Sequence, residues 1–258
     1  MTGTERGGSV QGESLQTLLA ELYRKHLTAA PANNYILEHQ APKCIANQVR
    51  TFEIYQPYLP ESGTILDWGC HHAPDSCLLR GRYGERFHLF ACDFEARDTY
   101  RTFHDYAQAD YHQITDNIQL PYPAKHFDAV IGSGVLEHTA MDYESLKELY
   151  RVLKEDGVLI LSYLPNNWSI QEWRNRVIRQ QGFHYRLYEK KETIRLLKRA
   201  GFYPLTIRYQ TFFWERVVKV MGLGRWKESL GEVLSWMIPL QVFSSTLFCV
   251  ARKVAVMR

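Results

Sequence analysis

Acidic residues and a glycine stand in this sequence at points where short apolar runs end. Asp67 and Gly69 lie at the end of the run 64–68, and Asp93 follows the run 87–92, 24 residues after Gly69. A glycine after a strand lets backbone N–H groups approach a ligand, because no Cβ stands in the way. A carboxylate after the next strand can accept hydrogen bonds from a ribose diol. These residues predict a nucleoside site, although a lone acid at a strand end can equally cap the following helix.

Alternating strand and helix patterns must position these residues. Apolar runs predict strands at 64–68, 87–92, 127–132, 157–163, 203–210 and 246–250, and helical periodicity predicts helices near 76–82, 142–154 and 189–200. Strands separated by helices form a parallel sheet with crossover connections. Ligands bind beyond the carboxyl ends of such strands. The pattern therefore predicts a doubly wound α/β fold with the acids at its ligand-binding edge.

The composition agrees with one globular core. Hydrophobic residues make up 45% and charged residues 23% of the 258 positions, which excludes a disordered or fibrous chain. A net charge of +3 is too small to indicate a dedicated nucleic-acid binder. The five cysteines form no CxxC pair and are typical of free thiols in a reducing compartment. The first residues lack the apolar stretch of a signal peptide, so we predict a cytoplasmic protein.

The predicted organisation places helices before and within the sheet. We expect a disordered lead-in at 1–12, a helical cap at 13–60, the ligand-binding core at 61–211, a helical insert or lid at 212–244, and the final strand and tail at 245–258. The uncharged stretch 233–251 has the length of a membrane span, but its polar residues argue against insertion. The aromatic, amphipathic residues 212–240 are typical of a core stripe, and as an insert they also suit a lid or a peripheral membrane contact.

The order of these pieces resembles the class I S-adenosylmethionine-dependent methyltransferases, in particular their small-molecule, ubiquinone-biosynthesis-like branch. The resemblance covers residues 64–202, and it is carried by the segments 65–70, 93, 109–111, 120–123, 127–138 and 153–159. It implies a Rossmann-like seven-stranded sheet, S-adenosylmethionine as the cofactor, and a cofactor-binding role for the core at 61–211.

The resemblance assigns the methionine portion of the cofactor to the first turn. Asp67 and the backbone of Gly69 and Cys70 would hold this portion. His71 and Ala73 depart from the family, which usually has glycines there. The His71 side chain would either crowd the cofactor's carboxylate or donate a hydrogen bond to it. A second hypothesis is therefore a binding or scaffold protein that keeps the fold without turnover.

The resemblance assigns the nucleoside to the next two strands. Asp93 would bond the ribose hydroxyls, and Asp110 would bond the adenine amine, with the ring flanked by Phe94 and Tyr111. The pocket for the transferred methyl group would be lined by the residues after the fourth strand, Ser133, Gly134 and Val135.

Two histidines follow strands on the acceptor side. A hydroxyl acceptor gains from a general base, and histidine titrates near neutral pH. His138 follows the strand at 127–132, and His184 lies in the element 183–188, which resembles an H-x-R-x-Y/F element of relatives. We predict His138 and His184 as catalytic residues and Tyr185 and Arg186 as substrate-binding residues. Either histidine can instead order its loop through a structural hydrogen bond.

The basic residues at 174–199 and the segment after the fourth strand bear on the class of acceptor. Nine basic residues against two acids between positions 174 and 199 form either a solvated helix face or a surface for a phosphate-bearing acceptor. Some relatives bind a divalent ion through Glu-x-x-Glu-His, but Gly134 replaces the first acid, so we predict no metal. We predict O-methylation of a small-molecule or lipid- or sugar-linked acceptor. RNA is the weaker alternative, and DNA is not expected.

Overall fold

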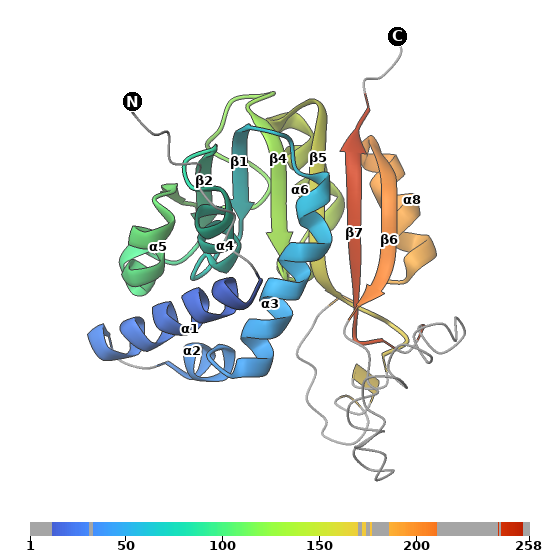
Figure 1. Ribbon diagram of the computed structural model, residues 1–258. Helices are drawn as coiled ribbons and strands as arrows, with labels where there is room; N and C mark the ends of the chain where they lie inside the picture. The colour runs from blue at the N-terminus through green and yellow to red at the C-terminus, as the bar shows by residue number, and fades with distance from the viewer. Residues whose placement is uncertain are drawn as a thin grey trace, which may run out of the picture.

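Seven strands form one mixed sheet in the part of the chain that the computed structural model describes, which is residues 12–30, 33–169, 172–173, 176, 186–210, 242 and 244–254. The sheet order is β3-β2-β1-β4-β5-β7-β6 (Figure 1). The strands are β1 (Gly63–Trp68), β2 (Phe87–Asp93), β3 (Asp110–Gln113), β4 (Phe127–Ser133), β5 (Leu153–Pro165), β6 (Phe202–Gln210) and β7 (Thr246–Lys253). The predicted Rossmann-like architecture is confirmed.

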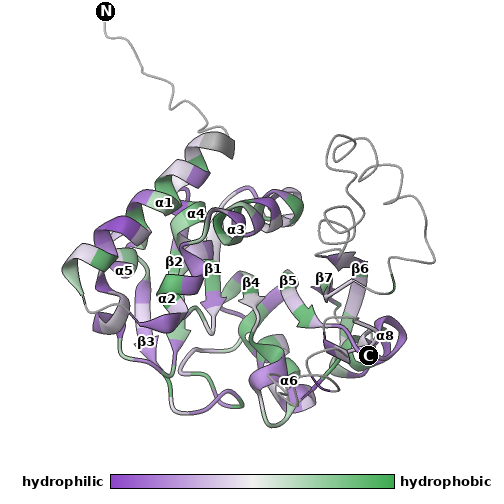
Figure 2. Cartoon of the chain, turned by 90° about the horizontal axis from the view of Figure 1, so that it is seen from below, coloured by the Kyte–Doolittle hydropathy of each residue, from purple (hydrophilic) through white to green (hydrophobic). Residues whose placement is uncertain are grey.

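Helices cover both faces of the sheet. They are α1 (Gly12–Ala29), α2 (Asn34–His39), α3 (Pro42–Tyr55), α4 (Pro74–Tyr83), α5 (Arg101–Ala107), α6 (Asp142–Val152) and α8 (Lys190–Ala200), with short 3₁₀ turns η1 (Gln56–Tyr58), η2 (Arg97–Tyr100) and η3 (Leu136–His138). In Figure 2 the helices α1, α3 and α4 lie on one side of the sheet, and α6 and α8 lie on the other. None of the helices among the described residues has the length and apolar character needed to cross a bilayer.

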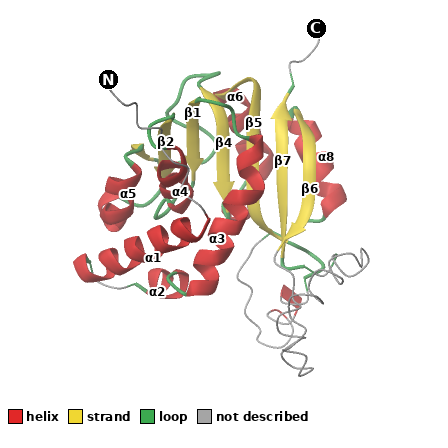
Figure 3. Cartoon of the chain, in the orientation of Figure 1, coloured by secondary structure: helices red, strands yellow, loops and turns green. Residues whose placement is uncertain are grey.

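One expectation about strand direction is wrong. The pattern of alternating strands and helices predicts a parallel sheet, but β7 runs antiparallel to both β5 and β6. The arrows in Figure 3 show this reversal. β7 starts beside the end of β6, where Gln210 pairs with Thr246. It therefore runs back along β6 in the opposite direction, and on its other side it pairs antiparallel with β5. The predicted lead-in at 1–12, except for residue 12, and the predicted insert at 212–244, except for residues 242 and 244, lie outside the described residues.

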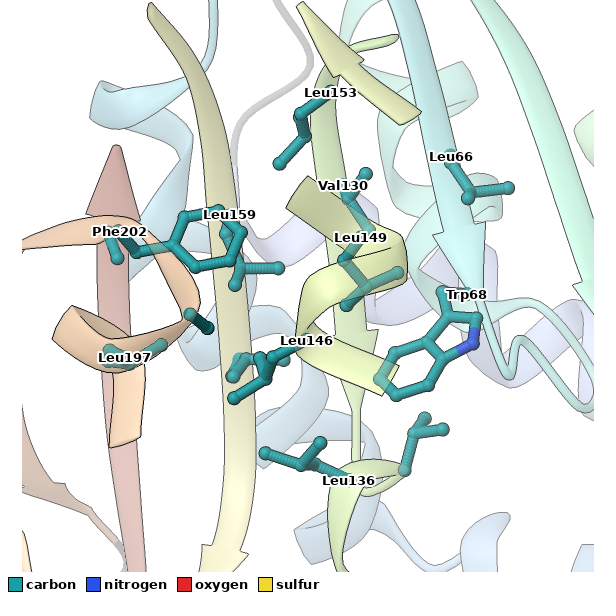
Figure 4. Packing of buried hydrophobic residues seen from close by; sticks show 14 of the residues in the cluster. Leu66, Trp68, Val130, Leu136, Leu146, Leu149, Leu153, Leu159, Leu197 and Phe202 are labelled. Carbon is teal, nitrogen blue, oxygen red and sulfur yellow. The ribbon is translucent and has the colours of Figure 1, made fainter. Parts of the chain in front are cut away.

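Two apolar layers follow from side-chain alternation along the strands. Ile65 points into the layer shared with α1, α3, α4 and α5, whereas Leu66 points into the layer shared with α6 and α8. In Figure 4, Leu66 and Trp68 of β1 lie beside Leu146 and Leu149 of α6. Because both faces of β1 are buried, its carboxyl end is held rigidly and can position the residues of the following turn.

Candidate active site

The turn after β1 has the backbone of a glycine-rich turn although two of its residues are not glycine. Gly69, His71 and Ala73 have φ values of +65°, +48° and +54°. A Cβ at Gly69 would lie 2.6 Å from the Val135 side chain, so no larger residue fits there without a shift. The left-handed conformation costs a residue with a Cβ about 1–2 kcal/mol, so other contacts must stabilise His71 and Ala73.

Aromatic contacts supply that stabilisation for His71. Its imidazole lies between the rings of Tyr35 in α2 and Tyr100 in η2, with centroid distances of 4.1 and 4.5 Å. Nε2 lies 3.1 Å from the Tyr100 hydroxyl. Burial lowers the pKa of His71, which favours the neutral ring. The side chain therefore lies between α2 and η2.

Asp93 connects this turn to the end of β2. Its Oδ2 accepts a hydrogen bond from the His71 N–H at 2.8 Å, and its Oδ1 accepts one from the Glu95 N–H at 3.2 Å. The residue is half-buried. Each carboxylate oxygen can accept a further hydrogen bond. Asp93 thus holds the local turns but does not cap the next helix, η2, whose N-cap is Ala96. Both of its oxygens can still accept from a diol.

A buried pair of carboxylates lies beneath the turn. The Ser76 N–H and hydroxyl donate to Oδ2 of Asp67, at 3.2 and 2.7 Å. Asp75 accepts hydrogen bonds from the Tyr55 and Ser133 hydroxyls at 2.7 and 2.6 Å. Burial and the nearby Asp75 charge raise the pKa of Asp67 to about 8. Two carboxylates held this close favour a cationic group, such as an α-ammonium or a sulfonium, in the adjacent space.

The residues predicted to line the methyl pocket lie at the end of β4, beside β5. The Ser162 hydroxyl donates to the Ser133 hydroxyl at 2.8 Å, which links the two strands. Gly134 has a φ of +69°, and a Cβ placed there would come no closer than 3.7 Å to Oε1 of Glu137. The predicted base His138 is 53% exposed, and its Nε2 lies 4.0 Å from Oε1 of Glu137. The structure thus brings Ser133, Gly134 and His138 to one edge, with Glu137 behind them.

The predicted nucleoside residues are only partly brought together. Phe94 follows Asp93 and leaves its ring 49% exposed, and the Tyr111 hydroxyl donates to the Glu95 carbonyl in the same loop. Asp110, however, pairs with Phe90 in the sheet and not with the end of β2. Its carboxylate lies 2.8 Å from Nε2 of His88, on an exposed part of the surface. The adenine role of Asp110 stays a prediction from the resemblance.

The acceptor residues predicted after β5 are mostly outside the described part of the chain. His184 and Tyr185 are not described. Arg186 forms an ion pair with Asp142 at the start of α6, so its charge is used within the fold. Within the described residues, no group of three or more histidine, cysteine or acidic side chains is arranged to hold a metal ion.

Three residues at this edge of the sheet are not predicted as site residues from the sequence. Asp75 and Tyr55 complete the polar group around Asp67, and Glu137 lies buried beside the methyl pocket. A signal for Asp75 exists in the sequence, since an acid directly after the Pro74 that begins a helix lies next to the ligand-binding turn. Tyr55 carries no such signal, because its contact depends on how α3 packs against α4.

The groups at this edge of the sheet match the chemical parts of the predicted cofactor. A carboxylate with both oxygens available ends β2, an exposed aromatic ring follows it, a buried carboxylate pair favours a cation, and Gly134 leaves room at the end of β4. A ribose, a purine, an ammonium and a sulfonium each find a matching group. The fold and this edge define the class I methyltransferase type of α/β protein.

Comparisons with known proteins agree with this class. A family model described as "Methyltransferase domain" matches residues 37–207, and the chain belongs to that family. None of the curated proteins matches the chain. The family, together with a solved relative that holds S-adenosyl-L-methionine, supports S-adenosylmethionine as the cofactor.

Solved structures with low sequence identity share the fold. Phosphoethanolamine N-methyltransferase 2 of Haemonchus contortus, in complex with S-adenosyl-L-methionine, is 16% identical with a TM-score of 0.57, over 80% of this chain and 52% of that chain. A SAM-dependent methyltransferase of Methanosarcina mazei is 16% identical with a TM-score of 0.54, over 78% and 97%. The [4+2]-cyclase SpnF is 15% identical with a TM-score of 0.59, over 99% and 100%.

Proposed function

We propose that this chain transfers a methyl group from S-adenosylmethionine to an oxygen of a small-molecule or lipid- or sugar-linked acceptor, as in the ubiquinone-biosynthesis-like branch. The observation that carries the proposal is the Asp93 carboxylate, held by the His71 and Glu95 N–H groups at the carboxyl edge of β2. A diol-binding acid beside a left-handed turn suits an adenosyl group. The proposed membrane contact of residues 212–240 would bring the protein to a lipid-linked acceptor.

The chain's residues have distinct tasks in this proposal. Bound S-adenosylmethionine supplies an electrophilic methyl group on a positively charged sulfur. Asp93 orients the ribose, and the buried pair of Asp67 and Asp75 favours the positive charges of the methionine portion. Gly134 leaves space for an acceptor at the end of β4. The main contribution of these groups is alignment of two reactants and exclusion of water.

A second candidate function is binding without turnover. It is favoured by His71 and Ala73, which occupy left-handed positions where the resemblance predicts glycines. The [4+2]-cyclase neighbour is a solved example of this fold that is named for a different reaction. A scaffold of this kind need not bind the methyl donor, so donor binding separates the two functions.

The test is calorimetric titration of the protein with S-adenosylmethionine and S-adenosylhomocysteine. We expect both to bind, and we expect Asp93→Ala to weaken each by about 1–3 kcal/mol because two hydrogen bonds to the ribose are lost. Asp98→Ala serves as the matched control, since Asp98 is exposed and pairs with Arg101 on the same loop. Absence of binding to the unmodified protein would favour the scaffold, and an unchanged affinity in Asp93→Ala would remove Asp93 from the site.

A further inference from the structure

The Glu137 carboxyl group is a buried polar group that the cofactor-binding residues do not use. Its side chain is 3% exposed, and its Oε2 has no hydrogen-bond partner among the residues that the structure describes. An isolated buried carboxylate is costly for a folded protein. A group of this kind at the carboxyl edge of a parallel sheet is typical of a functional residue, because a bound ligand can supply the missing interaction.

The position of Glu137 connects it to the methyl pocket. It lies in η3, directly after β4 and the Ser133–Gly134 turn. The nearest atoms that a Cβ at Gly134 would meet are Oε1 of Glu137 at 3.7 Å and Cβ of Tyr163 at 4.0 Å. A Cβ would fit at Gly134 in ordinary van der Waals contact, so the missing side chain leaves a methyl-sized space between the carboxyl group and β5. An acceptor atom in this space would contact Glu137.

Among the residues that the structure describes, no lysine or arginine is paired with Glu137. His138 Nε2 lies 4.0 Å from Oε1, and the buried Tyr188 before α8 faces the same carboxyl group. Arg186, near Tyr188, is paired with Asp142 of α6. Burial raises the pKa of Glu137 to about 8, and only its own backbone N–H lowers it. The group is therefore mainly neutral at pH 7 in the absence of ligand, and it becomes a base when a positive charge enters the pocket.

We propose that Glu137 is the catalytic base for a hydroxyl-bearing acceptor and that His138 passes the proton to solvent; this inference rests on the proposed function. The acceptor oxygen forms a bond to the methyl carbon while the bond from that carbon to sulfur breaks, and the electron pair of the broken bond stays on sulfur. The proton of the acceptor oxygen moves to Oε1 of Glu137, the oxygen that borders the space at Gly134. It leaves through His138, which is half exposed beside Oε1.

This arrangement also defines the class of acceptor. A neutral amine attacks without a base in contact with it, whereas an alcohol or phenol gains from losing its proton as the new bond forms. A carboxylate beside the methyl pocket therefore selects an acceptor with an acidic O–H group. Glu137 takes over the role that the sequence assigns to His138, and His138 becomes a relay at the surface.

The experiment compares two cofactor analogues on the full chain, so that no acceptor needs to be known. S-adenosylhomocysteine has a neutral sulfur, and sinefungin has an amine-bearing carbon in place of the methylated sulfur. At pH 9, where Glu137 is ionised, we expect sinefungin to bind at least about tenfold tighter than S-adenosylhomocysteine. We expect this preference to shrink at pH 6, where Glu137 is protonated.

Variants assign the preference to a residue. Glu137→Gln keeps the side-chain volume and removes the charge, so we expect it to fold, to bind S-adenosylhomocysteine normally and to lose the preference for sinefungin. Glu192→Gln, at an exposed position of α8, is the matched control and should keep it. Glu137→Asp retains a shorter carboxylate and should keep part of it.

The outcomes separate this inference from the proposed function. Failure of the unmodified protein to bind either analogue would overturn both. Normal binding with the same sinefungin preference in Glu137→Gln as in the unmodified protein would overturn the role of Glu137 alone. Loss of the preference in His138→Gln but not in Glu137→Gln would return the role of base to His138.

Discussion

The missing side chain of Gly69 allows the ligand-binding turn to pack closely against Val135, after the end of β4. Its φ is +65°, and a Cβ would meet the Val135 side chain at 2.6 Å. We expect Gly69→Ala to lower the free energy of unfolding by about 2–4 kcal/mol, because left-handed strain and a steric clash add together. Urea unfolding followed by circular dichroism measures the change.

Gly84 provides the control for that substitution. It also has a positive φ, +59°, but nothing lies within 4 Å of a Cβ built there. Its ψ is −127°, outside the left-handed helical region, so Gly84→Ala should cost backbone strain alone, about 1–3 kcal/mol. A loss in Gly69→Ala no larger than left-handed strain of about 1–2 kcal/mol would show that the contact with Val135 does not restrict position 69.

The sequence is informative about site residues that follow strands and less so about those that depend on packing. Gly69 and Asp93 are identified by spacing alone, and the structure joins them through one turn. Glu137 stands beside the predicted His138, yet its burial becomes visible only when η3 is packed against the sheet. The hydrogen bond of Tyr55 to Asp75 likewise joins two helices, α3 and α4. A local sequence pattern cannot predict it, because it depends on how these helices pack.

At the scale of elements, buried histidines connect the N-terminal helices to the ligand-binding turn. His72 Nε2 lies 2.7 Å from the Tyr23 hydroxyl of α1, and His104 of α5 lies 3.0 Å from the His71 carbonyl. Burial lowers the pKa of His26, His71 and His72, and it lowers that of His104 to about 4. All four therefore favour the neutral form in the folded protein.

The sign of the pH dependence follows from these lowered pKa values. The stabilisation by His104 is present above its unfolded pKa of 6.5, and it is lost as the pH falls toward about 4. The loss amounts to at most about 3 kcal/mol. We expect the protection factors of the α1 amides to fall between pH 6.5 and 4, so that their hydrogen exchange slows less than the chemical rate does.

Helix α8 is the internal reference for that measurement. It contains no histidine and lies on the opposite face of the sheet (Figure 2). After correction for the chemical rate, its protection should change less than that of α1. An equal loss of protection in α1 and α8 would mean that acid unfolds the molecule as a whole, without a special role of the histidines.

The elements that the sequence predicts best are those with long periodic patterns. Helix α6 and strand β6 match their expected ranges within two residues. Helix α2 has only six residues and begins after Asn33, whose Oδ1 accepts the Ile36 N–H at 2.8 Å, so its periodic signal is too short to recognise. Strand β5 begins at Leu153, before the expected Gly157, because residues between them bulge from the pairing with β4.

At the scale of the whole molecule, the predicted free thiols are confirmed. All five cysteines are unpaired, and four of them are buried; only Cys44 is partly exposed. Burial raises the pKa of Cys92 and Cys249 to about 12, which suppresses the reactive thiolate. We expect one thiol to react rapidly with a disulfide reagent in the native protein and all five to react in denaturant.

The Cys44→Ser variant checks this assignment, since it should abolish the rapid phase. Cys70 lies in the ligand-binding turn and is 4% exposed. A second rapid thiol that is removed by Cys70→Ser would show that the turn opens in solution. That result would contradict the closed packing of the N-terminal helices over the turn.

The interior position of β7 delays the pairing of β6 while the sheet assembles. β7 comes after the other six strands of this sheet in chain order, yet it lies between β5 and β6. Until residues 246–253 emerge, a nascent chain can join β1 to β5, whereas β6 has no neighbour to pair with and both of its edges are bare. Bare strand edges invite association with other chains. β6 therefore stays open to association with other chains until β7 pairs with it.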